Sequence, residues 1–148
     1  MSLIIVRTAR AQEYPHLAEL YERWGYCGGL HASDSIYVAE ATGQVVGIVR
    51  RTVEHDVLML RGMQVDPAYR RQGVGTLLLR ALVADVAGRE CFCIPFDHLA
   101  TFYRQGGFEV VPEATVPRFL AARLAQYRQE GHKVMVMRRP AEPDPVRL

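Results

Sequence analysis

Residues 59–86, MLRGMQVDPAYRRQGVGTLLLRALVADV, decide the fold. The stretch starts inside an expected strand of residues 57–65, in which apolar side chains stand on both faces, as in a strand that is covered on two sides. Asp66 and Pro67 end this strand, because proline has no N–H to give to a sheet and restricts the residue before it. A glycine-rich turn follows the strand, and a helix follows the turn.

The turn is RRQGVG at residues 70–75, and the helix is expected over residues 77–87. Apolar residues recur along it at helical spacing, namely Leu79, Leu82, Val83 and Val86. Gly88 stands where a C-terminal cap belongs, since glycine adopts the left-handed conformation that ends many helices. The order strand, glycine turn, helix is therefore expected here.

A glycine turn that opens a helix after a buried strand is typical of an anion site. The first turn of a helix has N–H groups without internal partners, and the helix dipole adds positive charge. Gly73 and Gly75 have no Cβ, so a diphosphate could approach the backbone closely, and Arg70 and Arg71 add full charges. The alternatives are plain strand-to-helix geometry for the glycines and a solvated surface for the arginines. We expect a phosphorylated ligand.

Two common phosphate-binding motifs do not fit this turn. A Walker A loop needs a lysine near its end, but Thr76 follows Gly75, and the one lysine of the chain is Lys133. A dinucleotide-binding fingerprint needs a third glycine where Leu78 stands, and an acid on a following strand. The ligand is thus expected to be neither a nucleoside triphosphate in a Walker loop nor a dinucleotide.

The pattern Arg70-x-x-Gly73-x-Gly75 resembles the pyrophosphate loop with which the GNAT N-acetyltransferase superfamily binds coenzyme A. A second segment, ATFYRQGGF at residues 100–108, resembles the family signature Phe-Tyr-x-x-x-Gly-Phe. Both motifs occur in the family's order, with the expected helix and strand between them. The resemblance extends over residues 3–138.

The resemblance implies an α/β (α+β) fold with a central mixed, mostly antiparallel sheet. About six or seven strands are expected, with a parallel splayed pair at the centre and about four helices around them. We expect one GNAT domain over residues 1–139 and a flexible tail over residues 140–148.

The periodicity of the chain gives the expected elements. Strands are expected at residues 3–7, 36–40, 45–52, 57–65, 90–95, 108–111 and 132–138, and helices at residues 11–24, 77–87, 99–105 and 117–129. Residues 25–34 are glycine-rich and are expected to be a loop in which the second helix of the family is short or absent. The helix at residues 117–129 could cover the acceptor site, form a dimer contact or simply cover the sheet.

The cosubstrate implied by the resemblance is acetyl-CoA. Its expected contacts on the strand and the loop are Met63, Gln64, Val65, Arg70, Arg71, Gln72, Gly73, Val74, Gly75 and Thr76. Its expected contacts on the second motif are Asp97, Phe102 and Tyr103. Family members often carry asparagine where Asp97 stands, and aspartate keeps an acceptor but lacks the amide donor.

The implied activity is that of an acyltransferase, an N-acetyltransferase that moves an acetyl group directly from the thioester of acetyl-CoA to a primary amine. The acceptor is a small molecule or a peptide. Tyr103 is the general acid implied for the departing thiolate, and its alternative role is packing beside Phe102 and Phe108. The alternative function is a noncatalytic module that binds or senses acyl-CoA.

The general base has no clear candidate on the central strand. Members with a side-chain base often place it where Met59 and Arg61 stand here, and neither residue can accept a proton. Strand alternation predicts that Arg61 shares a face with Met63 and points into the acceptor pocket. There Arg61 would bind an acceptor carboxylate or pair with an acid of the protein itself.

Several other side chains are placed near the acceptor by the resemblance. Tyr26 and His31 of the glycine-rich loop are expected to bind the acceptor, and these two, His98 and a chain of water molecules are alternative proton acceptors. Glu54 and His55 are interpreted as a solvated turn at the start of the strand.

Composition excludes several classes of protein. The chain has 148 residues, a net charge of +2 and a sequence pI near 8.5, with dispersed basic residues that do not indicate a nucleic-acid surface. Three cysteines, Cys27, Cys91 and Cys93, do not make a disulfide framework or a metal site. No signal peptide or membrane span is apparent, so we expect a cytoplasmic protein. A homodimer is an expectation from the family.

Overall fold

The structure is a computed structural model, and it describes residues 3–142. Its strands are β1 (Ile4–Thr8), β2 (Ser35–Ala41), β3 (Gln44–Glu54), β4 (Val57–Val65), β5 (Cys91–Cys93), β6 (Glu109–Val110) and β7 (Met137–Arg139). Its α-helices are α1 (Tyr14–Arg23), α2 (Val74–Val86), α3 (Ala100–Arg104) and α4 (Arg118–Gln129).

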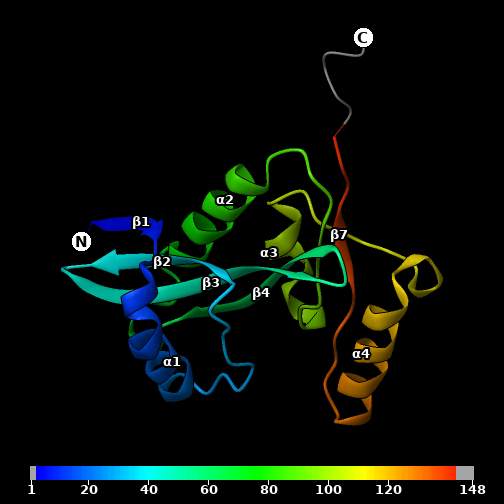
Figure 1. The fold of residues 1–148 in the computed structure, drawn as a ribbon, viewed down its shortest axis with the longest axis horizontal. Coiled ribbons are helices and arrows are strands. Elements are labelled where there is room, and N and C mark those ends of the chain that lie inside the picture. Colours follow the sequence, from blue (N-terminus) through cyan, green and yellow to red (C-terminus); the bar gives the residue numbers. More distant parts are fainter. Residues whose placement is uncertain (1–2, 143–148) are drawn as a thin grey trace.

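The seven strands form one mixed sheet in the order β1-β2-β3-β4-β5-β7-β6 (Figure 1). All neighbouring pairs are antiparallel except β4 and β5, which run parallel at the centre. The β4–β5 connection contains α2, as expected for a parallel crossover. The mixed sheet, its central parallel pair and its four helices confirm the fold expected from the sequence.

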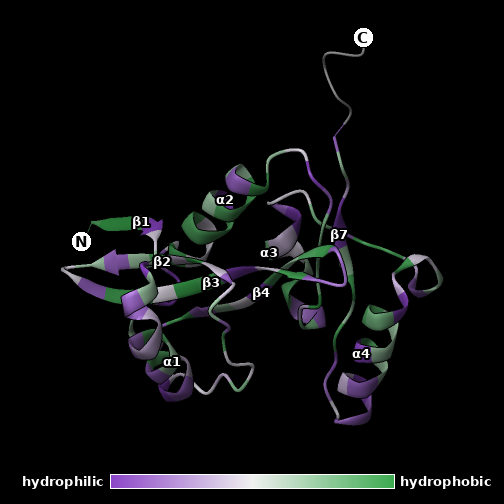
Figure 2. Ribbon diagram, in the orientation of Figure 1, coloured by the Kyte–Doolittle hydropathy of each residue, from purple (hydrophilic) through white to green (hydrophobic). Residues whose placement is uncertain are grey.

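The α2 face of the sheet carries the largest apolar core. Buried leucines of α2, such as Leu78 and Leu82, pack against strand residues from β2 to β5, and Tyr103 of α3 joins the same cluster. The helix α2 is mainly hydrophobic, whereas hydrophilic residues predominate on α1 and α4 (Figure 2). The core thus continues across the boundary between β4 and β5 on this face.

The opposite face is covered by two helices, α1 and α4, which lie apart from each other (Figure 1). Leu17 and Leu20 of α1 pack on the residues of β2 and β3. Leu120 and Leu124 of α4 pack on Met59 of β4 and on Phe92 of β5, among others. Three roles were considered for the helix at residues 117–129, and its packing shows that it covers the sheet.

Polar side chains separate the two apolar clusters of this face. They alternate along β3 and continue on β4, and we call this set the polar strip: Arg50, Thr52, Glu54 and Arg61. Arg50 lies opposite Arg61 in the strand register, so both side chains stand on the same face. The strip occupies the part of the sheet that neither α1 nor α4 covers with leucines.

The ends of α2 differ from the expectation. The helix begins at Val74, directly after Gly73, and not at residue 77. Gly88 is not the left-handed cap: Ala87 has the positive φ of 50° and donates its N–H to the carbonyl of Val83. A Cβ on Gly88 would lie 3.2 Å from the Cβ of Glu142. The glycine therefore lets the chain near residue 142 pass close to the end of α2.

The strands beyond α2 are shorter than expected. β5 covers three residues and β7 begins only at Met137, yet residues 133–135 still bond to residues 95–97 through single contacts. Met135 donates to the carbonyl of Pro95, and Asp97 donates to that of Lys133. Pro95 has no N–H to return a bond, which interrupts the ladder at this point.

The C-terminal end of the described chain is tied to the α2–β5 turn. Glu142 donates its N–H to the carbonyl of Gly88 at 2.9 Å, and its carboxylate accepts from Arg139 at 3.3 Å. Residues 140–142 of the expected tail are thus seen, and residues 143–148 lie outside the described residues. No helix between residues 3 and 142 combines the length and the apolar character that a membrane crossing requires.

Candidate active site

A bulge in β4 is the first feature of the site. Gly62 and Met63 together face the single residue Val49 of β3, because Gln64 pairs with Ile48 and Arg61 pairs with Arg50. Gly62 has a φ of 64°, the left-handed region in which glycine carries no steric cost. A Cβ at this position would lie 2.4 Å from the Tyr21 hydroxyl oxygen, so the space admits only glycine.

The bulge corrects the expected faces of β4. Met63 and Val65 pack against the cluster on the α2 face, whereas Met59 belongs to the cluster on the α4 face. Arg61 contacts Glu54 on the α4 face, so the prediction that it shares a face with Met63 was wrong. One extra residue in a strand reverses the side on which every later side chain stands.

The end of β4 has a free edge toward β5. The two strands pair only at Met59 and Phe92, and no strand of the described residues pairs with residues 63–65 on that side. We call this widening gap between β4 and β5 the seam. Backbone N–H and C=O groups of Met63, Gln64 and Val65 that point into the seam are available to a ligand that can form hydrogen bonds.

The glycine loop joins this free edge to the start of α2. Gly73 has a φ of 81° and is the N-cap of the helix, and Arg71 also takes a positive φ, 63°. A left-handed residue next to a right-handed helical one turns successive N–H groups toward the same side, as in an anion-binding nest, and Gly73 precedes the helical Val74 in this way. The helix behind it has 13 residues, enough for its dipole to add positive charge at the loop. The side chains of Arg70, Arg71 and Gln72 are exposed around it.

The remaining loop residues pack inward. The Val74 side chain is buried in the core on the α2 face, and Thr76 is half-buried on the first turn of the helix. Gly75 has an additional role that the sequence did not indicate, since a Cβ there would lie 3.3 Å from the Phe102 ring. The glycine lets α3 approach the loop, so the two sequence motifs meet in space.

Tyr103 stands at the seam with its ring in the core. Its side chain is 5% exposed and packs edge-on against Phe102 and Phe108. Burial raises the pKa of Tyr103 well above its ordinary value, and the nearby Cys93 and Tyr26 raise it further. Tyr26 belongs to the loop on the opposite face of the sheet, where its hydroxyl oxygen accepts from Arg50. A phenol with a raised pKa stays protonated at neutral pH.

Asp97 lies on the surface at the start of the turn that leads into α3. Its backbone N–H donates to the carbonyl of Lys133, and its side chain is exposed. The side chain is therefore accessible to a ligand near α3.

A buried ion pair, which the sequence reading missed, holds the glycine-rich loop. Arg50 has no exposed surface and donates to Asp34 Oδ2 at 2.8 Å and to the Tyr26 hydroxyl oxygen at 2.8 Å. Tyr21 completes the group, because its hydroxyl donates to the carbonyl of Gly62 at 2.7 Å. The signal was available in part, since strand alternation places Arg50 on the same side as the core residue Ile48.

The sequence interpretation of Glu54 as part of a solvated turn was wrong. Its carboxylate is half-buried and accepts from Arg123 of α4 at 2.8 and 3.1 Å, and Arg61 lies 3.6 Å from it. Burial alone would raise the pKa of Glu54, but the hydrogen bonds from Arg123 outweigh it and lower the pKa. Glu54 is therefore a carboxylate at neutral pH. His55 does lie exposed in the turn, against the ring of Phe119.

The two remaining histidine candidates lie on the surface. His31 is exposed and approaches Asp34 only through its backbone, while His98 is exposed and stacks beside Phe96. Neither side chain takes part in the buried polar network around Arg50. The structure does not bring His31 together with Tyr26 in that network. Within the part of the chain that the structure describes, no group of three or more histidine, cysteine or acidic side chains is arranged to hold a metal.

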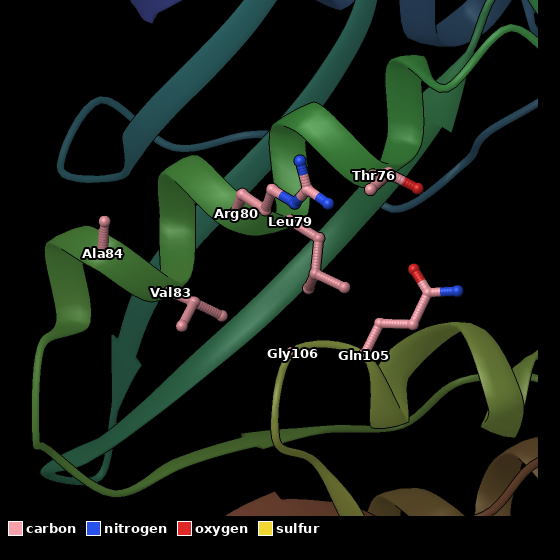
Figure 3. A pocket seen from close by; sticks show the side chains of 7 residues that line it. All are labelled: Thr76, Leu79, Arg80, Val83, Ala84, Gln105 and Gly106. Atoms are coloured by element: carbon pink, nitrogen blue, oxygen red, sulfur yellow. The ribbon is translucent and has the colours of Figure 1, made fainter.

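A groove of about 360 Å³ runs beside the loop, between α2 and the end of α3. Figure 3 shows the Leu79 side chain of α2 pointing toward Gly106 and Gln105 across it, with Thr76 and Arg80 also lining the groove. The Arg80 guanidinium and the Gln105 amide offer hydrogen-bond donors at its rim. The groove continues the loop because Thr76, on the first turn of α2, lines it.

Comparison with protein families gives a match over residues 32–110, more than half of the chain, to a model described as an acetyltransferase (GNAT) domain. The chain belongs to the GNAT acetyltransferase family. The matched segment begins before β2 and ends in β6, so it contains the bulge, the glycine loop and Tyr103. Comparison with curated proteins found no match.

Solved structures share the GNAT fold with this chain at low sequence identity. N-acetylglutamate synthase from Neisseria gonorrhoeae, complexed with coenzyme A and N-acetyl-glutamate, has a TM-score of 0.69 and 19% identity. The match covers 97% of this chain and 36% of the synthase, so the chain spans well under half of that protein's length.

Two further structures are similar over nearly their whole length. Rv2747 from Mycobacterium tuberculosis, solved in complex with CoA, has a TM-score of 0.71 and 18% identity, and the match covers 94% of this chain and 99% of that one. The ribosomal-protein-S18-alanine N-acetyltransferase from Escherichia coli has a TM-score of 0.70 and 16% identity, with 99% of both chains covered. At these identities, the similarity establishes the shared GNAT fold.

Proposed function

We propose that this protein is an acetyl-CoA-dependent N-acetyltransferase that acts on a primary amine. The observation that carries the proposal is the free edge of β4 directly beside the glycine loop at the N-terminus of α2. One ligand could bond to both features: a pantetheine amide to the strand edge and a diphosphate to the loop. Two of the similar structures contain coenzyme A, which supports this choice.

Each part of the coenzyme has residues that suit it. The amide groups of the pantetheine arm would bond to the backbone of Met63 and Val65, completing the sheet as a further strand would. The diphosphate would accept from the loop N–H groups, with Arg70 and Arg71 beside it. The groove along α2, with Arg80 at its rim, would receive the adenosine end.

The reaction would be a direct transfer at the seam. The amine nitrogen attacks the thioester carbon, the carbonyl oxygen becomes an oxyanion, and a backbone N–H at the bulge of β4 stabilises it. The carbon–sulfur bond then breaks, and the sulfur takes the proton of the Tyr103 hydroxyl. The amine loses its proton to water or to a side chain not yet assigned. Holding amine and thioester together would supply most of the rate increase.

The binding part of the proposal is tested with Gly73→Glu. Calorimetric titration with acetyl-CoA should give saturable binding in the micromolar range for the native protein, about −8 kcal/mol, and none for the variant. The new carboxylate would repel the diphosphate at the loop. Gly43→Glu is the matched control, because Gly43 has a φ of 77° and open surroundings, as Gly73 does, but lies in the β2–β3 turn. Loss of binding in both variants, or in neither, would contradict the assignment.

The catalytic part is tested with Tyr103→Phe, which keeps the ring and removes the hydroxyl. Turnover, measured as thiol release with an accepted amine, should fall about 100-fold, while the affinity for acetyl-CoA stays nearly unchanged. Tyr37→Phe is the control, since the Tyr37 hydroxyl bonds to Asp85 within the same core cluster, away from the seam. Equal turnover of Tyr103→Phe and the native protein would remove the general-acid role.

One observation favours the second candidate function, a noncatalytic acyl-CoA-binding module. The β4 positions beside the bulge on the α4 face carry Met59 and Arg61, neither of which is a base. Acetyl-CoA binding without thiol release in the presence of any primary amine would support the module over the enzyme.

A further inference from the structure

Three arginines meet the polar strip on one side of the sheet, and they differ in how fully they are paired. Arg50 is completely buried and bonded to Asp34 and Tyr26. Arg123 reaches the polar strip from α4 and holds both oxygens of Glu54. Arg61 has only a 3.6 Å approach to Glu54 and no hydrogen bond to any described residue. A guanidinium with free donors is thus left on the polar strip, on the hairpin side of the bulge.

The charges around Arg61 do not cancel. The three arginines face two carboxylates, Asp34 and Glu54, so one positive charge remains. The Arg61 side chain is 21% exposed, so it can be reached by a ligand yet is partly shielded from water. A partly shielded cation binds an anion more strongly than a fully solvated one does.

The direction of the Arg61 side chain sets where that anion would bind. Residue 61 directly precedes Gly62, but its guanidinium reaches back toward Glu54, which pairs with Val57 four residues earlier on β4. An amine held at the bulge for transfer would therefore carry its anionic group several bonds away, on the hairpin side of the bulge. A planar guanidinium binds a carboxylate through two parallel hydrogen bonds.

We infer that the acceptor is a small amine that carries a carboxylate, such as an amino acid, and that Arg61 binds this carboxylate. Glu54 holds the Arg61 guanidinium on one side, and the donors of Arg61 that face away from Glu54 receive the acceptor. Arg50, sealed by Asp34, shapes the site without contacting the acceptor. The inference rests on the proposed function, because it names the acceptor for the same reaction.

The experiment compares the common L-amino acids with their carboxamides, each incubated with acetyl-CoA and followed by thiol release. Spermidine serves as a cationic amine. We expect the best amino acid to exceed its own amide at least about tenfold in kcat/KM, because a bidentate charge-assisted pair contributes that much or more. Equal use of acid and amide, a preference for spermidine, or no transfer to any of these amines by a protein that binds acetyl-CoA would overturn the inference.

Variants assign the preference to Arg61. Arg61→Gln should remove it through a rise in KM for the amino acid, with the amide unaffected, and Arg61→Lys should restore it in part. Arg51→Gln is the matched control: Arg51 is 23% exposed and paired with Asp85, but on the α2 face. An unchanged preference in Arg61→Gln would refute the role of Arg61.

The calorimetric titration with acetyl-CoA separates this inference from the proposed function. If the protein and Arg61→Gln both bind acetyl-CoA while the carboxylate preference is absent, only the acceptor class is wrong. If the native protein does not bind acetyl-CoA, the proposed function itself fails, and the acceptor class fails with it.

Discussion

Arg50 carries a full charge with none of its surface exposed, so its environment must compensate for the lost hydration. Asp34, itself almost fully buried, provides the opposite charge, and the rings of Tyr21 and Tyr26 lie 5.7 and 5.9 Å from the guanidinium carbon. The pair connects the end of the glycine-rich loop to β3. Arg50 also donates to the Tyr26 hydroxyl oxygen, so this loop residue is fixed to the frame of the sheet.

Asp34→Ala should therefore cost about 3–5 kcal/mol in the free energy of unfolding, because it leaves the Arg50 charge buried without a counter-ion. Urea denaturation of the purified variant measures this. Glu113→Ala is the contrast, since it removes the partner of Arg128 on the surface and should cost about 0–1 kcal/mol. Similar losses of unfolding free energy in the two variants would show that the buried Arg50–Asp34 pair contributes no more to stability than a surface pair does.

The residue scale also shows where sequence reasoning succeeded and failed. Gly73 and its neighbours were predicted as a strand–turn–helix unit because that unit is local. The face of Arg61 was wrong because the bulge at Gly62 reverses the alternation, although a glycine inside a strand is a known sign of a bulge. Strand alternation with Ile48 indicated the burial of Arg50, but its pairing with Asp34 could not be predicted, since the fold, and not the spacing, brings the two residues together.

At the scale of elements, α4 shows how a helix with few apolar residues is held on the sheet. Leu120 and Leu124 are its only fully buried residues among the described ones, and Arg123 adds the bond to Glu54. The sequence predicted the helix and its bounds within a residue. It did not predict the polar contact, because Glu54 and Arg123 lie on segments whose packing is not encoded in local periodicity.

This contact should make stability depend on pH. The pKa of Glu54 is lower in the folded protein than its ordinary value of 4.5, so the folded state favours the carboxylate. The contribution is complete above about pH 4.5 and is lost as the pH falls through the folded-state pKa. Arg123→Gln should cost about 1 kcal/mol at pH 7 and should flatten the loss of stability below about pH 4.5.

Urea denaturation at a series of pH values measures both effects. Arg128→Gln on the same helix is the control, because Arg128 pairs with an exposed carboxylate. If the free energy of unfolding of Arg123→Gln fell with pH as steeply as that of the native protein, the Glu54–Arg123 contact would not contribute to the pH dependence of stability.

At the scale of the whole molecule, the sheet is two units joined at the seam. β1 to β4 form one continuous antiparallel ladder, β5, β7 and β6 form another, and a single residue pair connects them through the ladder. The sequence predicted the parallel pair at the centre from the β4–α2–β5 connection. The splaying of this pair was implied by the family resemblance and not by the local sequence pattern, because the length of a ladder depends on how far two strands diverge.

A sheet with a gap in its ladder leaves backbone hydrogen-bonding groups through which a ligand could bridge its two units. A coenzyme lying in the seam would touch both units, and a ligand that binds only the assembled form stabilises that assembly by mass action. The chain could thus be cut between Ala87 and Gly88, after α2 has packed on the first unit, to give two fragments. The extent of their recombination would rise with the concentration of coenzyme A. The fragments would then form a split biosensor in which the coenzyme replaces the hydrogen bonds missing between β4 and β5.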